Sequence, residues 1–360
     1  MANVGRREVL RLAGMAAAAA VWPGRARASD MTHRERIEAA LRGAPTDRAP
    51  FGFWWHFANE DRSPRRLAEL AVALQRRLDL DFIKFSPYGL YSVVDWGVTL
   101  EIFAGNHRAP VQASYPIQKA DDWLALEPRS GEDGEYLVLL EAQRIALDML
   151  DGQVPFTQTI FSPLTSAAKM VGRDELPKHI REHPEQLHEG LRVITETTAR
   201  FVKQVVDRGA DGLFFASQAV DPSYITPEEH AEFAKRYDLQ VLEATAGKTW
   251  FDIFHLHGQE ISFDQVLDYP VHAFNYHDRD YGPSLSEMRK RTDKCLLGGI
   301  SPGGAIATGT PDEVAWEVED AWRQLGGRGL IITPGEVVNP RSKPANVDRL
   351  RAAIEATRSG

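Results

Sequence analysis

A closely spaced pair of histidines is the pattern in this 360-residue sequence that most directly suggests chemistry. In His255-Leu256-His257-Gly258 the imidazoles stand two residues apart, so an extended backbone would point both to one side. Two imidazoles and one carboxylate from a neighbouring strand form a metal site with open positions, and Glu336 is the candidate carboxylate. From this pattern alone the alternative stays open that one histidine packs structurally and the other only donates hydrogen bonds.

Alternating strand-like and helix-like segments are expected to position this pair. The expected strands span residues 51–56, 81–86, 154–161, 211–216, 250–255, 273–276, 295–299 and 329–333. The expected helices span residues 32–41, 64–78, 133–150, 173–206, 226–246, 262–267, 284–291, 310–325 and 345–357, with a hairpin and loops over 91–128. Eight strand–helix units predict an α/β fold, a single (β/α)8 TIM barrel. The alternative, an open doubly wound sheet, is expected to carry a glycine-rich motif after its first strand, and the sequence has no such motif there.

Polar residues follow the expected strands, at the end where barrel enzymes place their catalytic groups. His56 ends the first strand and His277 follows the sixth, and each is a candidate acid or base. A solvated loop histidine is the alternative for His277. Glu336, after the eighth strand, is a third catalytic candidate. The candidate substrate-binding residues also stand at strand ends: Trp55, Tyr88, Ser217, Gln218 and Asn275.

The N-terminus predicts a bacterial export signal over residues 1–28, with the barrel over 29–360. Arg6-Arg7 opens a twin-arginine pattern, an apolar stretch follows, and Ala26-Arg27-Ala28 supplies a signal-peptidase site. A disordered basic tail is the alternative. An export signal would make the twin-arginine translocase a partner and the periplasm or exterior the destination.

Composition excludes several function classes. Cleavage after Ala28 would remove five arginines and one glutamate and move the net charge from −9 to about −13, which argues against nucleic acid and anionic membranes. No apolar run reaches the roughly 18 residues that an integral membrane protein needs. Cys295 is the only cysteine, so an intrachain disulfide and a cysteine-rich metal site are both excluded.

Four motifs resemble the uroporphyrinogen decarboxylase superfamily. Residues 209–217 read GADGLFFAS, followed by ITPEEHAEFA at 225–234. The closing motifs are GTPDEV at 309–314 and ITPGEVVNP at 332–340. The resemblance extends over about residues 31–358 and independently implies a (β/α)8 barrel.

The superfamily includes two chemistries. Uroporphyrinogen decarboxylases work without a cofactor and carry two arginines after the first strand and an aspartate after the second. Residues 53–60 here hold no arginine, Phe85-Ser86-Pro87-Tyr88 holds no aspartate, and the mouth reads as poor in cations, all of which argues against that activity.

The other branch contains zinc-dependent, corrinoid-linked methyltransferases with an H-x-C-G motif and a further cysteine in the eighth-strand motif. Here His257 and Glu336 take the places of the two cysteines. The resemblance therefore implies a divalent metal at His255, His257 and Glu336. Zinc is expected first, and the harder donors also suit iron, manganese or cobalt.

Together these expectations describe a metal-dependent barrel enzyme that transfers a methyl or other C1 unit, or removes a carboxylate, on a small organic substrate. A corrinoid, or a corrinoid protein as partner, and a homodimer are open expectations. One rival is a cofactor-free decarboxylase of a tetrapyrrole-like acid. The other is a periplasmic protein that binds a corrinoid, porphyrin or metal without turnover.

Overall fold

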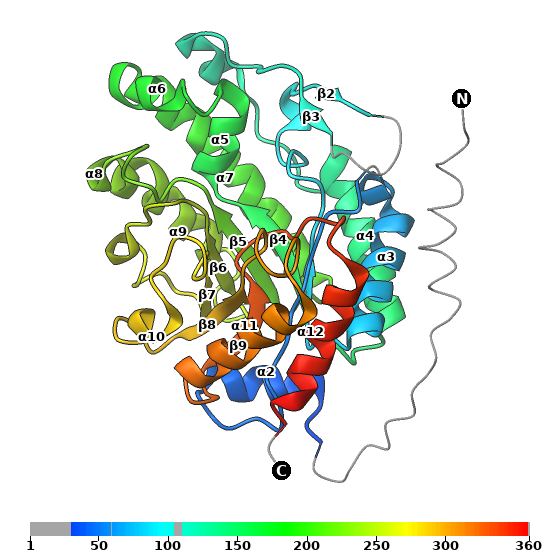
Figure 1. The fold of residues 1–360 in the computed structure, drawn as a ribbon. Coiled ribbons are helices and arrows are strands. Elements are labelled where there is room, and N and C mark those ends of the chain that lie inside the picture. Colours follow the sequence, from blue (N-terminus) through cyan, green and yellow to red (C-terminus); the bar gives the residue numbers. More distant parts are fainter. Residues whose placement is uncertain (1–29, 59, 104–109, 359–360) are drawn as a thin grey trace, which may run out of the picture.

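A curved parallel sheet forms the centre of the protein, with helices around it (Figure 1). The computed structural model describes residues 30–58, 60–103 and 110–358, so the expected export signal lies outside the described residues. Each strand pairs in parallel with the next in the order β1 (Ile83–Phe85), β4 (Phe156–Phe161), β5 (Gly212–Ser217), β6 (Ile253–Leu256), β7 (Ala273–Asn275), β8 (Cys295–Ile300) and β9 (Leu330–Pro334). Seven of the eight expected strands are therefore confirmed.

The first expected strand, residues 51–56, is not a continuous strand in the structure. It forms two isolated parallel bridges to the β9 side, Phe51 with Ile332 and Trp55 with Val338, and no continuous ladder. The ladder is interrupted because Pro334 has no N–H to donate. Phe51 still accepts a hydrogen bond from the Asp81 N–H at 2.8 Å, so the segment lies between β9 and the residues that lead into β1.

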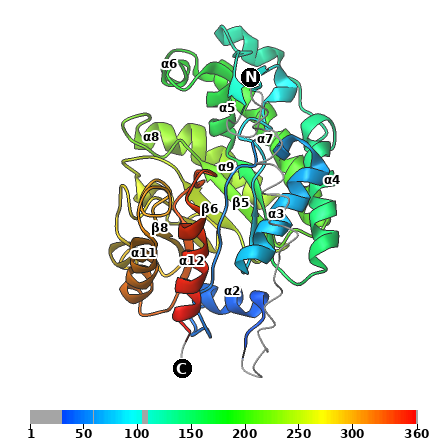
Figure 2. The same cartoon turned by 45° about the vertical axis from the view of Figure 1, so that its right-hand side comes forward.

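Helices follow most strands and surround the sheet. Their bounds are α2 (His33–Leu41), α3 (Pro64–Leu78), α4 (Gly134–Leu150), α5 (Pro163–Val171), α6 (Leu176–Glu182), α7 (Pro184–Asp207), α8 (Pro227–Glu229), α9 (Arg236–Glu243), α10 (Leu285–Met288), α11 (Pro311–Gln324) and α12 (Pro344–Ala356). The 3-10 helices are η1 (Glu60–Arg62), η2 (Val94–Trp96), η3 (Ala120–Ala125) and η5 (Phe263–Gln265), and η4 (His230–Lys235) is a π-helix. Helix α2 lies at one end of the sheet, and α5 and α6 lie toward the other (Figure 2).

Two local results bear on the site. The expected hairpin between residues 91 and 128 is a short antiparallel pair, β2 (Leu100–Glu101) with β3 (Val111–Gln112). Helix α5 begins at Pro163, ten residues before the expected helical region. Ser162 caps it by accepting the Thr165 N–H, and proline occupies its first position, so Ser162-Pro163 starts a helix directly after β4.

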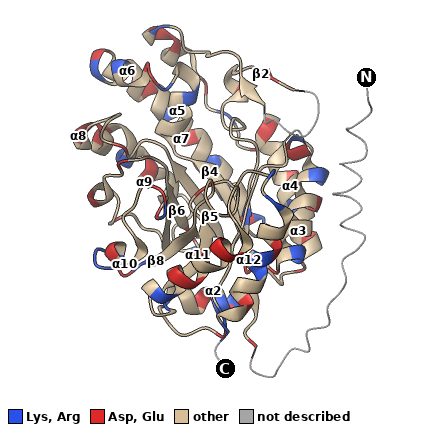
Figure 3. Ribbon diagram, in the orientation of Figure 1, with Lys and Arg blue, Asp and Glu red and all other residues tan. Residues whose placement is uncertain are grey.

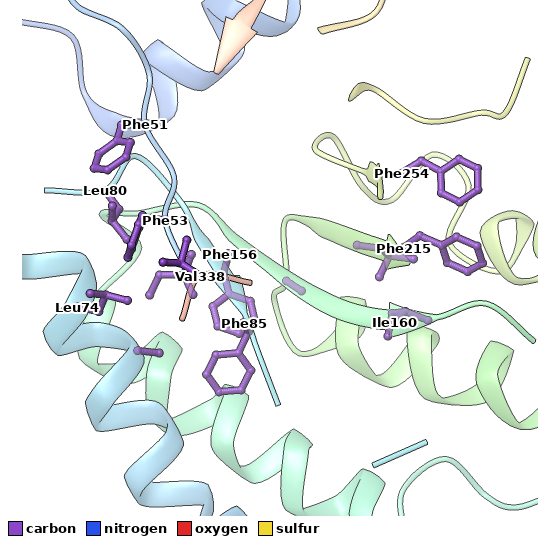
Figure 4. Close-up of a cluster of buried hydrophobic side chains, with 14 of the residues drawn as sticks. Phe51, Phe53, Leu74, Leu80, Phe85, Phe156, Ile160, Phe215, Phe254 and Val338 are labelled. Atoms are coloured by element: carbon purple, nitrogen blue, oxygen red, sulfur yellow. The ribbon is translucent and has the colours of Figure 1, made fainter. Parts of the chain in front are cut away.

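Apolar side chains alternate between the two faces of the strands. One face packs against the helices, and Phe85, Phe156, Phe215 and Phe254 belong to this layer (Figure 4). The other face forms a separate inner cluster that includes Trp54, Phe214, Ile253 and Cys295, closed below by Ile37 and Ala40 of α2. The Cys295 thiol is fully buried there, which raises its pKa to about 12.

Charged residues mark the outer surfaces of the helices, and the sheet between them is largely uncharged (Figure 3). Among the residues that the structure describes, no helix combines the length and apolar character needed to cross a bilayer. The few charged or titratable groups on the inner face of the strands therefore stand out, and they form the site described next.

Candidate active site

His257, His277 and Glu336 form a compact group of ligand atoms. One ligand atom from each residue lies within 4.8 Å of the other two. His257 Nδ1 is 3.2 Å and His277 Nε2 is 3.6 Å from the same oxygen, Glu336 Oε2, and the two nitrogens are 3.4 Å apart. Two imidazoles and one carboxylate around a common point are a donor set that binds divalent transition metals.

The ends of three strands bring these residues together. His257 follows β6, His277 follows β7 and Glu336 follows β9, all at the carboxyl ends of parallel strands. The His257 N–H donates to Ser217 O at 3.0 Å, which extends the pairing of β6 with β5 by one residue. At Gly335 a Cβ would lie 2.9 Å from both the His277 Cα and the Tyr276 O, so only glycine lets the end of β9 approach the end of β7 this closely.

His277 and Glu336 stabilise each other's charged form. Burial alone would lower the pKa of His277, but the carboxylates of Glu336 and Asp280 outweigh it, so the pKa is raised. Burial opposes ionisation of Glu336, but hydrogen bonding and charge from His257 and His277 hold its pKa far below the usual range. Asp280 Oδ2 is 3.6 Å from His277 Nδ1, and the Ser301 hydroxyl donates to Asp280 Oδ1 at 2.6 Å. Asp280 therefore places a negative charge beside His277 on the side facing away from Glu336, although His277 Nδ1 has no hydrogen-bond partner among the described residues.

His255, the third expected ligand, lies deeper and outside this group. Its ring stacks on Phe214 with centroids 5.2 Å apart, and its Nδ1 is 2.6 Å from Asn275 Oδ1. Burial lowers the pKa of His255 to about 3, and the neighbouring His257 adds to the effect. The expected set of His255, His257 and Glu336 thus differs from the observed cluster, in which His277 takes the place of His255.

Asn275, expected to bind substrate, is fully buried and makes its hydrogen bonds within the protein. Its amide NH2 donates to Leu297 O at 3.1 Å, to Pro334 O at 3.1 Å and to Thr333 Oγ1 at 3.3 Å. Asn275 therefore holds the ring of His255 rather than facing the opening of the site.

A second polar group lies after the first strand segment and β1. His56 Nδ1 is 3.7 Å from Asp61 Oδ2, and neither atom has a hydrogen-bond partner in the described parts of the chain. Burial, with the charges of two nearby lysines, lowers the pKa of His56 to about 4. Burial raises the pKa of Asp61 to about 6. Tyr88, also buried, adds an unpartnered hydroxyl, and burial beside Glu135 raises its pKa. At pH 7 His56 and Tyr88 are therefore neutral, whereas Asp61 is mostly ionised and can accept a proton.

Two lysines lie near His56, and the sequence analysis, which expected a mouth poor in cations, missed them. Lys84 of β1 is buried, donates to Ser86 Oγ at 3.0 Å and lies 4.8 Å from the Phe214 ring centroid. Burial lowers the pKa of Lys84 to about 7. Lys169 of α5 donates to Gly89 O at 2.7 Å, and burial lowers its pKa strongly. The sequence contained a signal for this group, because Lys84 stands between Ile83 and Phe85 in an otherwise apolar strand.

The remaining expected substrate contacts are dispersed. Ser217 is fully buried at the end of β5, whereas Gln218 lines a cavity beside α5. Trp55 packs edge-on against Phe53 and Phe57, in the layer between the strands and the helices. Trp55 therefore faces away from the inner side on which Trp54 lies.

A curved seven-stranded parallel sheet surrounded by helices, with polar groups at the carboxyl ends of its strands, places the protein in the α/β class. The family model described as "Uroporphyrinogen decarboxylase (URO-D)" matches residues 32–357. The chain belongs to the uroporphyrinogen decarboxylase family.

Relatives within this family extend over nearly the whole chain. The methylcobamide:CoM methyltransferase MtaA of Methanosarcina barkeri is 23% identical over 343 residues, which cover 90% of this chain and 98% of that protein. The methylcobamide:CoM methyltransferase MtbA of Methanosarcina acetivorans is 20% identical, and the match covers 89% of this chain and 97% of that protein. Uroporphyrinogen decarboxylase of Schizosaccharomyces pombe is 25% identical over 251 residues, 64% of this chain and 68% of that protein.

Solved structures agree on the fold. A methyltransferase from Methanosarcina mazei superposes with a TM-score of 0.80 at 19% identity. The match covers 91% of this chain and 99% of the methyltransferase chain. A B12-independent methionine synthase from Shewanella sp. W3-18-1 gives a TM-score of 0.53 at 12% identity. The match covers 86% of this chain and 98% of the synthase chain.

Proposed function

We propose that this protein is a divalent-metal-dependent enzyme that transfers a methyl or other C1 unit to or from a small organic substrate. The observation that carries this proposal is the cluster of His257, His277 and Glu336, whose ligand atoms lie within 4.8 Å of one another at the mouth of the sheet. The methyltransferase relatives, which match the chain almost end to end, support C1 transfer. A corrinoid or corrinoid protein is the corresponding methyl donor or acceptor.

The donor set suits a metal of intermediate hardness, and zinc, iron, manganese and cobalt are the candidates. When bound, such an ion would act as a Lewis acid toward a substrate oxygen, nitrogen or sulfur atom. Asp280 lies 3.6 Å from His277 Nδ1 and would orient that ring when an ion is bound, and the hydrogen-bonded pair of Asn275 and His255 lies buried next to the cluster. His56 Nδ1 and the Asp61 carboxyl, with pKa values near 4 and 6, supply a site that takes up or releases a proton across the mouth.

Three further parts of the proposal concern the whole chain. Residues 51–56 serve as the eighth strand and close the barrel between β9 and β1. Residues 1–28 serve as a twin-arginine export signal, so that the mature enzyme of residues 29–360 works in the periplasm or outside the cell. The twin-arginine translocase is then its export partner.

Metal analysis of the full chain purified without chelator tests the proposal. We expect about one divalent ion per chain, lost in His257→Ala and Glu336→Gln and kept in His183→Gln, which changes a histidine far from the cluster. Methyl transfer from a methylcobamide to a thiol should require the ion. A chain without stoichiometric metal, or variants that bind metal as the wild type does, would refute the proposed function.

Cofactor-free decarboxylation of a tetrapyrrole-like acid is the second candidate, favoured by the buried Lys84 and the partly buried Lys169, which could hold substrate carboxylates. Loss of carboxylate from uroporphyrinogen by metal-free protein would select it. A bound tetrapyrrole or corrinoid without any turnover would instead indicate a binding protein.

A further inference from the structure

Lys84 is a buried amine on the inner face of the sheet, and the proposed metal chemistry makes no use of it. Phe82, two residues earlier, belongs to the inner cluster, whereas Ile83 and Phe85 belong to the layer against the helices. Side chains alternate between the two faces of a strand, so Lys84 points inward as Phe82 does. Lys84 also stands near the carboxyl end of β1, the end at which the sheet carries its other polar groups.

The surroundings of the Lys84 amine are aromatic and offer no opposite charge. Its Nζ lies 4.8 Å from the ring centroid of Phe214 and 5.7 Å from that of Trp54. Lys84 forms no ion pair with any residue in the described ranges, and burial lowers its pKa to about 7. About half of the molecules therefore carry an uncharged amine at pH 7, against roughly one in 3,000 for an ordinary lysine. The uncharged amine is the nucleophilic form.

The hydrogen bond to Ser86 leaves the lone pair of this amine free. Lys84 Nζ donates to Ser86 Oγ at 3.0 Å, and the Ser86 hydroxyl donates to the Lys84 carbonyl at 3.2 Å. Because the hydroxyl proton is directed at that carbonyl, Ser86 Oγ accepts from the amine and does not donate to it. Ser86 thus fixes the position of the nitrogen while the lone pair stays available.

Phe214 connects Lys84 with the histidines of the proposed metal site. The ring of His255 stacks on Phe214 with centroids 5.2 Å apart, and the rings of His255 and His257 are 6.2 Å apart. Burial, helped by the charge of Lys84, lowers the pKa of His255 to about 3 and that of His56 to about 4. Both histidines are therefore neutral at pH 7, and the amine lies in the same mouth as the metal site.

We propose that Lys84 binds a small aldehyde covalently, as an imine. The lone pair of Nζ attacks the carbonyl carbon, a carbon–nitrogen double bond forms, and the carbonyl oxygen leaves with both amine protons as water. One amine and one aldehyde thus give one imine and one water, without an oxidant or a reductant. A lysine desolvated in an apolar pocket is a recurrent nucleophile toward carbonyl compounds.

The space beside Lys84 limits the size of the aldehyde. A cavity of about 20 Å³ is lined by Lys84 and Ser86 together with Trp54 and other apolar residues. One water molecule needs roughly 10–15 Å³ of such space, so the cavity admits the carbonyl group of a small aldehyde and excludes a bulky one. This inference goes beyond the proposed function and does not rest on it, because imine formation needs no metal ion.

Reductive trapping in the full chain tests the proposal. The protein is treated at pH 7 with a small excess of acetaldehyde and cyanoborohydride, which reduces an imine to a stable ethylamine, and peptide mass mapping locates the labelled lysines. We expect Lys84 to be labelled at least about ten-fold faster than Lys248, an exposed lysine paired with Asp207, because far more of Lys84 is uncharged. Lys84→Met should lose this rapid label, and Lys248→Met should keep it.

Carbon NMR with isotopically labelled acetaldehyde checks the result without a reductant. An imine carbon signal should appear for the wild type and be missing for Lys84→Met, which replaces the amine by an apolar chain. Labelling of Lys84 no faster than that of Lys248, or an imine signal that persists in Lys84→Met, would overturn the proposal. His257→Ala separates this inference from the proposed function, because that variant should lose the metal ion and still trap the aldehyde at Lys84.

Discussion

His255 donates its Nδ1–H to Asn275 Oδ1 across 2.6 Å, and this pair lies directly beneath the proposed metal site. The direction of the bond follows from Asn275, whose NH2 group donates to the carbonyls of Leu297 and Pro334, which can only accept. The proton of neutral His255 is therefore on Nδ1, and its Nε2 keeps a lone pair.

His255 should accordingly remain neutral throughout the range in which most histidines titrate. Its pKa of about 3 places protonation below pH 5, mainly because burial disfavours the charged form. Nitrogen NMR of metal-free protein labelled at histidine should show an Nδ1–H tautomer that does not change between pH 5 and 8. The spectrum of His255→Gln assigns the signal, and titration of that signal near pH 6.5 would contradict the assignment.

Asp280 should tune metal affinity without touching the ion. Its carboxylate faces His277 Nδ1 at 3.6 Å and is held by the Ser301 hydroxyl. Loss of such an orienting partner weakens metal binding about 10- to 100-fold. We expect this loss for Asp280→Asn in a competition titration against a chelator of known affinity. Asp264→Asn, a change to an exposed aspartate paired with Arg291, should bind the ion as the wild type does.

Gly335 should be indispensable to the approach of β9 toward β7. Gly335→Ala would place a methyl group 2.9 Å from the His277 Cα, so either the backbone moves or the contact strains. We expect a loss of about 1–3 kcal/mol in unfolding free energy together with weaker metal binding. Gly303→Ala is the control, since a Cβ there meets no atom within 4 Å. Equal stability of the two variants would show that this close approach does not hold the cluster together.

Lys84 should lower the stability of the protein most strongly at neutral and acidic pH. Its pKa is about 7 in the folded chain against 10.5 for an ordinary lysine, so between these values the unfolded chain binds more protons. The folded state therefore gains stability as the pH rises from 7 to 10.5. Lys84→Met should be more stable than the wild type by about 2–4 kcal/mol at pH 7, and this advantage should shrink toward pH 10.5.

Urea unfolding at pH 7, 8.5 and 10 measures the effect. Lys248→Met, which removes an exposed lysine paired with Asp207, should differ little from the wild type at every pH. A stability difference for Lys84→Met that is independent of pH would mean that Lys84 is charged and solvated in the folded chain.

The sequence predicted seven of the eight strands, because apolar runs mark them. It also placed His257 and Glu336 after strands, and both follow strands in the structure. The pairing of His277 with Glu336 could not be predicted, since it depends on how closely β7 and β9 approach at Gly335. The irregular first strand escaped prediction for a similar reason, because the break in its ladder comes from Pro334 on the partner strand.

Helix α5 and Lys169 show a different limit. Ser162-Pro163 ends a strand and begins a helix at once, and the sequence analysis used it only as a strand end. The helix that was overlooked carries Lys169, which lines the cavity beside α5, so an error in one helix boundary concealed this lysine.

The position of Cys295 gives this chain an experimental advantage. Its one thiol is sealed in the inner cluster with a pKa near 12, so thiol reagents should leave the native protein unmodified. A cysteine introduced at position 257 or 336 would then be the single sulfur within reach of a label. Thiolate ligation could thus be compared with imidazole or carboxylate ligation in one scaffold, with protection of that sulfur from alkylation as a direct measure of metal occupancy.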